Sequence, residues 1–186
     1  QGEADLAAFS AARKVQQSLF PSGAPCLPGF DIAGAVHPAE RVSGDFFDYL
    51  PLGQDSTGVL VADVSGYGLG PALLMSQPQA YLRARAENCT DPGELLQRAN
   101  RLFATSDSGH FVTTFLGRLD VQTRSFVYLG AGHQAYLIAN DGAVRVLSSH
   151  SVPLGVEQSV APCRTAKITL EAGDIRVVPP EGADEA

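Results

Sequence analysis

The sequence is built mainly from short strand-like segments that follow one another after turns. The clearest turn is the "NDG" of residues 140–142, which separates "QAYLIA" from "AVRVLS" and is a strong hairpin signal. The other strand-like segments are residues 30–36, 45–52, 57–64, 110–120, 124–132, 163–170 and 174–178. Because alternating segments joined by short turns pair with their neighbours, this order predicts antiparallel sheets.

Two helical patterns lie outside this series of strands. Apolar residues recur at roughly helical spacing over residues 4–19, with polar residues between them, and Pro21 stops the pattern. Residues 68–88 also have a helical apolar pattern, which Pro78 is expected to kink or break because proline lacks a backbone N–H.

A third helix is predicted over residues 91–105, where the start signals are strong. Asp91 is a good N-cap, Pro92 suits the first helical position, and Glu94 completes a capping box. Two long helices are therefore inserted after the third strand. We expect an α+β fold with helices layered outside antiparallel sheets, and not a doubly wound parallel sheet.

Composition excludes several classes of partner and location. The 186 residues suit one domain, and the net charge of -7 argues against nucleic acid and against an anionic membrane surface. No apolar run is long enough to cross a membrane, and the first residues do not resemble a signal peptide. Cys26, Cys89 and Cys163 are odd in number and far apart, which is typical of reduced thiols in a cytoplasmic protein.

Three aspartates in and beside strand-like segments are candidates for metal binding. Asp45 and Asp48 lie in "SGDFFDYL", and Asp63 ends the strand-like "VLVAD" just before "VSGYG". A carboxylate at the edge of a hydrophobic core needs a compensating partner, and Mg²⁺ and Mn²⁺ prefer oxygen ligands. The alternative is that these side chains cap turns and the following helix, and spacing alone favours that alternative.

His133 is a weaker candidate. It lies in the glycine-flanked turn of "GAGHQAYL", where it could help to bind an anion or a leaving group. A histidine in such a turn is more often a packed or solvated residue.

Seven blocks, taken in order, carry a resemblance to a known family. They are "QQSLFP", "VSGDFFDYL", "VADVSGYGLGPALLM", "TTFLGRLD", "YLGAGHQAYL", "PLGV" and "LEAGDI". From about Ala11 to its end the sequence resembles the SpoIIE-type branch of the PPM metal-dependent protein phosphatases, which includes the RsbU-like regulators of bacterial stress sigma factors. The resemblance implies an αββα sandwich, in which two antiparallel sheets are flanked by helices and two Mn²⁺ or Mg²⁺ ions lie at one edge.

The resemblance also implies roles for individual residues. Asp45 would be a bridging metal ligand, Asp63 a second ligand, and the backbone carbonyl of Val64 a third. Glu181 falls where the family has a metal-binding aspartate. Asp48 matches a family position of less settled role, and we expect it, with His133, at most to contact substrate.

The function implied is the removal of phosphate from serine or threonine of a partner protein, typically a phosphorylated anti-sigma factor antagonist of the STAS type. The family's last strands carry a further metal-binding aspartate, and this sequence ends at Ala186 before them. Together with Glu181, this leaves open a second function, in which a degenerate phosphatase domain acts as a binding or scaffold module. We expect residues 21–186 to form the phosphatase domain and residues 1–20 to form a linker or homodimerisation helix.

Overall fold

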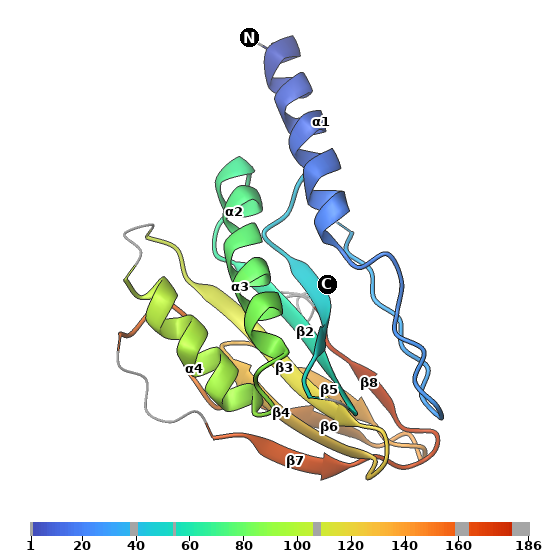
Figure 1. Ribbon diagram of the computed structural model, residues 1–186. Coiled ribbons are helices and arrows are strands. Elements are labelled where there is room, and N and C mark those ends of the chain that lie inside the picture. The colour runs from blue at the N-terminus through green and yellow to red at the C-terminus, as the bar shows by residue number, and fades with distance from the viewer. Residues whose placement is uncertain (1, 38–40, 54, 106–108, 159–163, 180–186) are drawn as a thin grey trace.

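The computed structural model describes residues 2–37, 41–53, 55–105, 109–158 and 164–179. The strands are β1 Phe46–Pro51, β2 Ser56–Val64, β3 Val112–Asp120, β4 Ser125–Ala131, β5 Ala135–Ile138, β6 Val144–Leu147, β7 Ala166–Thr169 and β8 Ile175–Val177. The helices are α1 Gly2–Leu19, α2 Leu69–Leu74, α3 Ser76–Ala86 and α4 Pro92–Phe103. Two antiparallel sheets, ordered β1-β2-β3-β4-β7 and β6-β5-β8, confirm the predicted α+β class (Figure 1).

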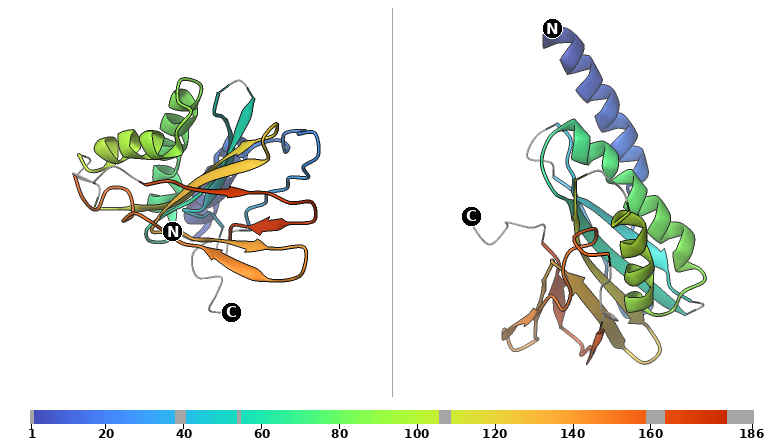
Figure 2. Two further views of the ribbon diagram at one scale, coloured as in Figure 1. Left: turned by 90° about the horizontal axis from the view of Figure 1, so that it is seen from below. Right: turned by 90° about the vertical axis from the view of Figure 1, so that its left-hand side faces the viewer.

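The two sheets form a sandwich, and α3 and α4 cover the outer face of the larger sheet (Figure 2). Strand β3 runs through the middle of the larger sheet and is buried on both faces. Its Leu116 belongs to the core between sheet and helices, and its neighbour Phe115 belongs to the core between the two sheets. Because successive side chains of a strand point to opposite faces, one strand contributes to both cores.

The predicted break in the first inserted helix occurs, but it falls at Met75 and not at Pro78. Helix α2 ends at Leu74 and α3 begins at Ser76, so that Pro78 lies in the first turn of α3. Proline cannot donate to the carbonyl four residues earlier, and its ring crowds that carbonyl. The residue four before Pro78 is Leu74, which explains why the helix breaks there.

The predicted start of α4 is confirmed. The Asp91 side chain accepts a hydrogen bond from the Gly93 N–H at 2.8 Å, and Pro92 is the first helical residue. The predicted capping box is not formed in the described structure, because the Glu94 carboxylate pairs with Arg98 one turn further along the helix and accepts no bond from the Asp91 N–H.

The prediction of a strand over residues 30–36 is wrong. Apart from a single bridge between Leu27 and Phe30, this segment pairs with no strand in the described part of the chain. Its apolar side chains Phe30 and Ile32 instead pack on the core between the sheets. The alternation that suggested a strand therefore reflects burial along the side of the sandwich and not ladder hydrogen bonds.

The last two strands were predicted correctly, but they belong to different sheets. Strand β7 pairs with β4, and β8 pairs with β5. The Asp174 N–H donates to the Glu171 carbonyl at 3.2 Å in the turn between them, so the chain crosses from one sheet to the other at this turn.

The outer face of the three-stranded sheet is apolar and exposed in the described structure. Val144 and Val146 of β6 and Ile175 and Val177 of β8 are each between 42% and 63% exposed. They flank Tyr136 and Ile138 of β5 in register.

None of the helices in the described ranges is both long enough and apolar enough to cross a lipid bilayer.

The aromatic stack between the sheets gives a stability prediction. A Cβ atom at Gly117 would lie 2.0 Å from Cζ of Phe126, and the Phe126 ring is held by stacking on Phe115 and Tyr128. We expect Gly117→Ala to lower the free energy of unfolding by about 1–3 kcal/mol, because the rigid ring must move. Urea unfolding measures this change.

The matched control is Gly23→Ala in the loop after α1, where an added Cβ meets no atom within 4 Å. We expect its unfolding free energy to stay within about 0.5 kcal/mol of the wild type. Equal stability of the two variants would contradict the packing described for Phe126.

Candidate metal centre

Asp45 and Asp63 lie opposite each other where β1 begins and β2 ends. Phe46 pairs with Ala62 in the antiparallel ladder, and the Val64 N–H donates to the Gly44 carbonyl at 3.3 Å. The register thus continues beyond β1 and sets Asp45 across from Asp63. Directly opposite residues share a face of the sheet, with Cβ atoms about 4.5–5.5 Å apart. The two aspartates predicted as metal ligands therefore lie together.

Gly44 explains how the third predicted ligand joins them. A Cβ atom at this position would lie 2.5 Å from the Val64 carbonyl oxygen and 2.8 Å from Oδ1 of Asp63. Only glycine permits such a close approach of backbone to these two oxygens. The Val64 carbonyl and the Asp63 carboxylate thus flank one small space, which any side chain at position 44 would fill.

The Asp45 carboxylate is held in place by its own loop. The Ser43 hydroxyl donates to Oδ2 of Asp45 at 2.7 Å and accepts from the Asp45 N–H at 3.1 Å. This pair of bonds ties the carboxylate to the backbone that precedes β1, so that Asp45 is oriented before any ligand binds.

The donor set fits a hard divalent cation. Two carboxylates and one backbone carbonyl are the oxygen ligands that Mg²⁺ and Mn²⁺ select, and these ions keep several waters. The described ranges contain no group of three or more His, Cys, Asp or Glu side chains that could hold a metal ion. The candidate ligands within the described residues remain Asp45, Asp63 and the Val64 carbonyl, and Glu181 lies outside the described residues.

A buried polar pair lies beside the candidate centre, on the next strand. Thr113 of β3 pairs in register with Asp63, and its hydroxyl lies 3.2 Å from Nδ1 of His133. Nε2 of His133 donates to the Pro179 carbonyl at 2.8 Å, so a neutral ring accepts from Thr113 at Nδ1. His133 is 4% exposed and holds the segment after β8 against β3.

The contacts of His133 bear on its predicted role in the site. His133 is a packed residue engaged at both ring nitrogens, so its placement does not favour the anion-binding role. The His133 bond to Pro179 ties the segment after β8 to the edge of the sheet that carries Asp63. The signal for Thr113 in the sequence is a polar residue inside an otherwise largely apolar strand, and it does not by itself distinguish Thr113 from an ordinary strand residue.

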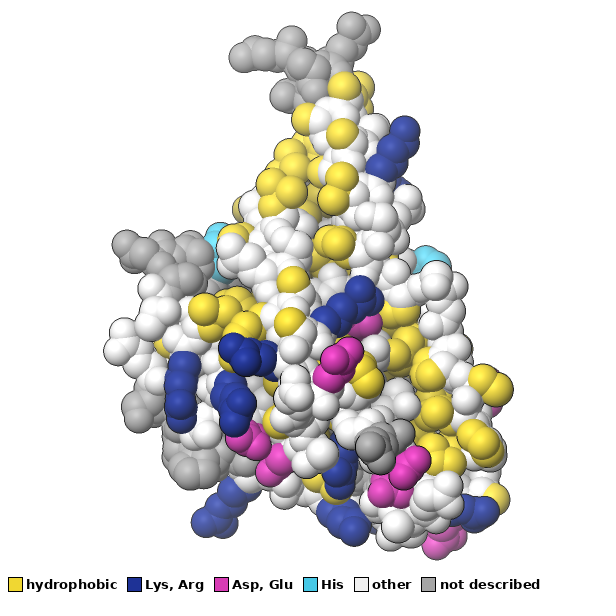
Figure 3. Space-filling model, in the orientation of Figure 1, with side chains coloured by type: hydrophobic (Ala, Val, Ile, Leu, Met, Phe, Trp, Pro, Cys, Tyr) yellow, Lys and Arg dark blue, Asp and Glu magenta, His cyan; other side chains and the backbone are white. Residues whose placement is uncertain are grey.

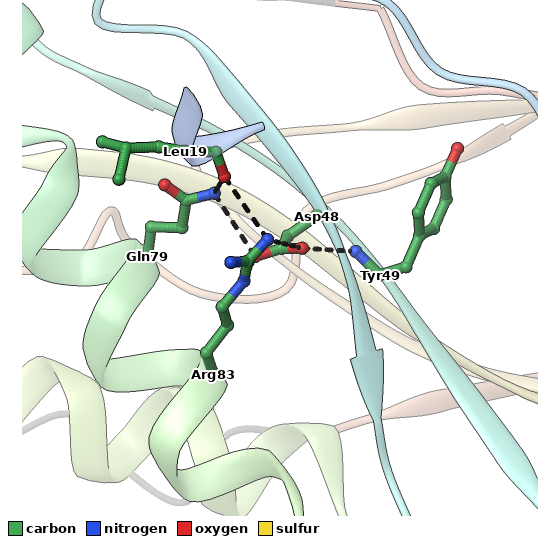
Figure 4. Close-up of polar contacts among 5 residues, drawn as sticks. All are labelled: Leu19, Asp48, Tyr49, Gln79 and Arg83. Carbon is green, nitrogen blue, oxygen red and sulfur yellow. Dashed lines mark hydrogen bonds and ion pairs between the residues drawn. The ribbon is translucent and has the colours of Figure 1, made fainter. Parts of the chain in front are cut away.

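Asp48 lies on the opposite face of β1, away from Asp45. Its side chain is 1% exposed and pairs with Arg83 of α3, which is 46% exposed. Arg83 Nη2 donates to Oδ1 of Asp48 at 2.9 Å, and Gln79 donates to Oδ2 at 3.3 Å and to the Leu19 carbonyl at 2.8 Å (Figure 4). The hydrogen bond to Asp48 raises the pKa of the Arg83 guanidinium. The group joins β1, α3 and the end of α1, and this placement gives no support to a substrate contact.

Comparison with solved structures defines the class of fold. The SiaA-PP2C domain of Pseudomonas aeruginosa superposes with a TM-score of 0.76 at 19% identity, over 93% of this chain and 70% of that one. The structure of the RsbU and RsbW domains of a Mycobacterium tuberculosis protein gives a TM-score of 0.64 at 28% identity, over 74% of this chain and 38% of that one. The fold is that of the PP2C-type phosphatase domains.

Sequence comparison gives the family. The family model of Stage II sporulation protein E (SpoIIE) matches residues 53–186, and the chain belongs to this family. Over 177 residues the chain is 28% identical to the phosphoserine phosphatase RsbU of Bacillus subtilis (strain 168). The aligned region covers 94% of this chain and 52% of RsbU. The chain thus spans about half the length of this curated relative. The resemblance stated from the sequence is confirmed.

The Asp48 network gives a second prediction. We expect Arg83→Met to lower the free energy of unfolding by about 1–3 kcal/mol, because it leaves a buried carboxylate without its cation. The loss is smaller than for a fully buried pair, because Arg83 is half exposed to water. Equilibrium unfolding in guanidinium chloride measures this loss of stability.

Arg101→Met is the matched control, since Arg101 is exposed in the last turn of α4. It should change stability by no more than about 0.5 kcal/mol. If Arg83→Met cost no more than this control, the Asp48–Arg83 pair would not be what joins α3 to β1.

Proposed function

We propose that this chain is a phosphatase domain that uses Mn²⁺ or Mg²⁺ to hydrolyse phosphoserine or phosphothreonine on a bacterial regulatory protein. The observation that carries the proposal is the position of Asp45 opposite Asp63, with the Val64 carbonyl beside them. Membership of the SpoIIE family and the similarity to RsbU support the same class of reaction.

Each residue of the candidate site would have a distinct role. Asp45 and Asp63 supply the negative charge that holds a divalent ion, and Val64 supplies a neutral ligand. Ser43 fixes the orientation of Asp45, and Gly44 keeps the space beside the oxygens open. Once bound, such an ion activates water and neutralises charge on the phosphoryl oxygens. Two ions are the family expectation, and the described ligands account for one.

The partner we propose is a phosphorylated regulator of the STAS type in sigma-factor control. The support is that RsbU, to which the chain is similar, is named a phosphoserine phosphatase. We place this activity in the cytoplasm, where such regulators act.

A degenerate domain that binds a phosphoprotein without cleaving it is the second candidate. Glu181 favours it, because glutamate carries one more methylene than the aspartate of the family and Mg²⁺ tolerates misplaced ligands poorly.

Hydrolysis assays separate the two functions. We expect the chain to hydrolyse p-nitrophenyl phosphate only when Mn²⁺ or Mg²⁺ is added, and Asp63→Asn to lower the rate at least about a hundredfold, because it removes a ligand charge. Asp55→Asn, at an exposed residue of the turn between β1 and β2, is the control and should keep the wild-type rate.

Folded wild-type protein that binds Mn²⁺ by calorimetry but shows no turnover at any Mn²⁺ concentration would replace the phosphatase with the binding module. Equal loss of rate in Asp63→Asn and Asp55→Asn would show that the site lies elsewhere.

We also propose that α1 pairs with a second copy of the chain. The helix projects beyond the sandwich (Figure 1), and Figure 3 shows hydrophobic side chains along its projecting part. Leu6 is 46% exposed there. Apolar side chains on a projecting helix are buried efficiently by pairing with a like helix.

Sedimentation tests the pairing. We expect the wild type to sediment as a dimer and Leu6→Glu as a monomer, because a charge would enter the helix interface. Ala7→Glu adds the same charge at the next exposed position and should remain dimeric. A wild type that sediments as a monomer at all concentrations tested would refute the pairing.

A further inference from the structure

One side chain of α1 is buried although it is polar. Gln16 is 4% exposed, whereas its neighbours Val15 and Gln17 are exposed. The helical pattern of the sequence placed Gln16 among the polar residues between apolar ones, which predicts exposure. Burial of an amide costs free energy unless its donors and acceptor are paired, so the partners of Gln16 identify what it does.

The Gln16 amide binds the backbone of the loop that carries Asp45. Its Nε2 donates to the Ser43 carbonyl at 2.6 Å, and its Oε1 accepts from the Ser43 N–H at 3.2 Å. Nε2 also lies 3.3 Å from the Ala72 carbonyl of α2, to which it donates a second bond. A single side chain thus satisfies both backbone groups of a residue 27 positions further along the chain.

Ser43 connects the Gln16 amide to Asp45, the candidate ligand. Gln16 fixes the backbone of Ser43, while the Ser43 hydroxyl donates to Oδ2 of Asp45 and accepts from the Asp45 N–H. The Gln16 amide and the Asp45 carboxylate are therefore connected through one residue, Ser43, which Gln16 binds at the backbone and Asp45 binds at the hydroxyl. Helix α2, held by the same amide through Ala72, begins five residues after Val64.

We propose that Gln16 is a positioning residue, which couples the docking of α1 to the position of the Asp45 carboxylate and so to the affinity for the divalent ion. The coupling to metal rests on the function proposed above, whereas the coupling to the loop stands on the hydrogen bonds alone. Residues that orient a metal ligand typically change metal affinity by about 10–100-fold when they are mutated.

The experiment compares Gln16→Met with Gln17→Met in the full chain. Methionine keeps the length and helix propensity of glutamine but removes the amide, and Gln17 is its exposed neighbour. Two readouts are needed: Mn²⁺ affinity by calorimetry, and hydrogen–deuterium exchange of residues 42–47 in the presence of EDTA. We expect Gln16→Met to bind Mn²⁺ about tenfold more weakly and to exchange several-fold faster over these residues, with Gln17→Met unchanged in both.

The outcomes separate the inference from the proposed function. Mn²⁺ affinity and exchange that are the same in Gln16→Met and Gln17→Met would overturn the inference and leave the phosphatase standing. A wild type that binds no Mn²⁺, with exchange still faster in Gln16→Met, would refute the metal function and keep the coupling to the loop.

A merely structural role would lower the melting temperature of Gln16→Met without changing the affinity of the folded protein for Mn²⁺. If Gln16→Met does not fold, Ser43→Ala tests the second step, because it removes the hydroxyl that holds Asp45 and leaves the Gln16 bonds to the backbone in place. Wild-type Mn²⁺ affinity in Ser43→Ala would then overturn the proposal.

Discussion

Two like charges at the meeting of β1 and β2 are the constraint on which the site depends. Ionised carboxylates at directly opposite positions of an antiparallel pair repel each other, and a divalent cation bound between them would relieve this repulsion. The backbone of Gly44 approaches the Asp63 and Val64 oxygens so closely that no side chain can occupy the space. A site with this charge and this opening is suited to a small divalent ion that keeps part of its water shell.

Strand β1 carries a further aspartate, Asp48, whose side chain lies on the opposite face of the sheet from that of Asp45. Because β1 alternates, Asp45 faces the edge with the candidate ligands, while Asp48 faces the helices and pairs with Arg83. Helix α1 is connected to both faces, through Gln16 to the loop before Asp45 and through the Leu19 carbonyl to Gln79. The position of the first helix is thus tied by polar contacts to the loop that carries Asp45, a candidate metal ligand.

Local patterns predicted most elements and failed where tertiary contacts decide. The "NDG" hairpin and the Asp91 cap depend on a few adjacent residues, and both are confirmed. Residues 30–36 alternate between apolar and polar side chains as a strand would, but in the described structure no neighbouring strand forms a ladder with them. The family motifs identified Asp45 and Asp63, but nothing local shows that Gln16 is buried or that Thr113 contacts His133, because those contacts join residues 20 or more positions apart.

The most direct test of the account is the site of a bound ion. In crystals grown with Mn²⁺, an anomalous difference peak should lie between Asp45 and Asp63, about 2.0–2.3 Å from a carboxylate oxygen of each and near the Val64 carbonyl. A well-ordered structure at millimolar Mn²⁺ with the two carboxylates turned apart and no peak between them would contradict the central claim.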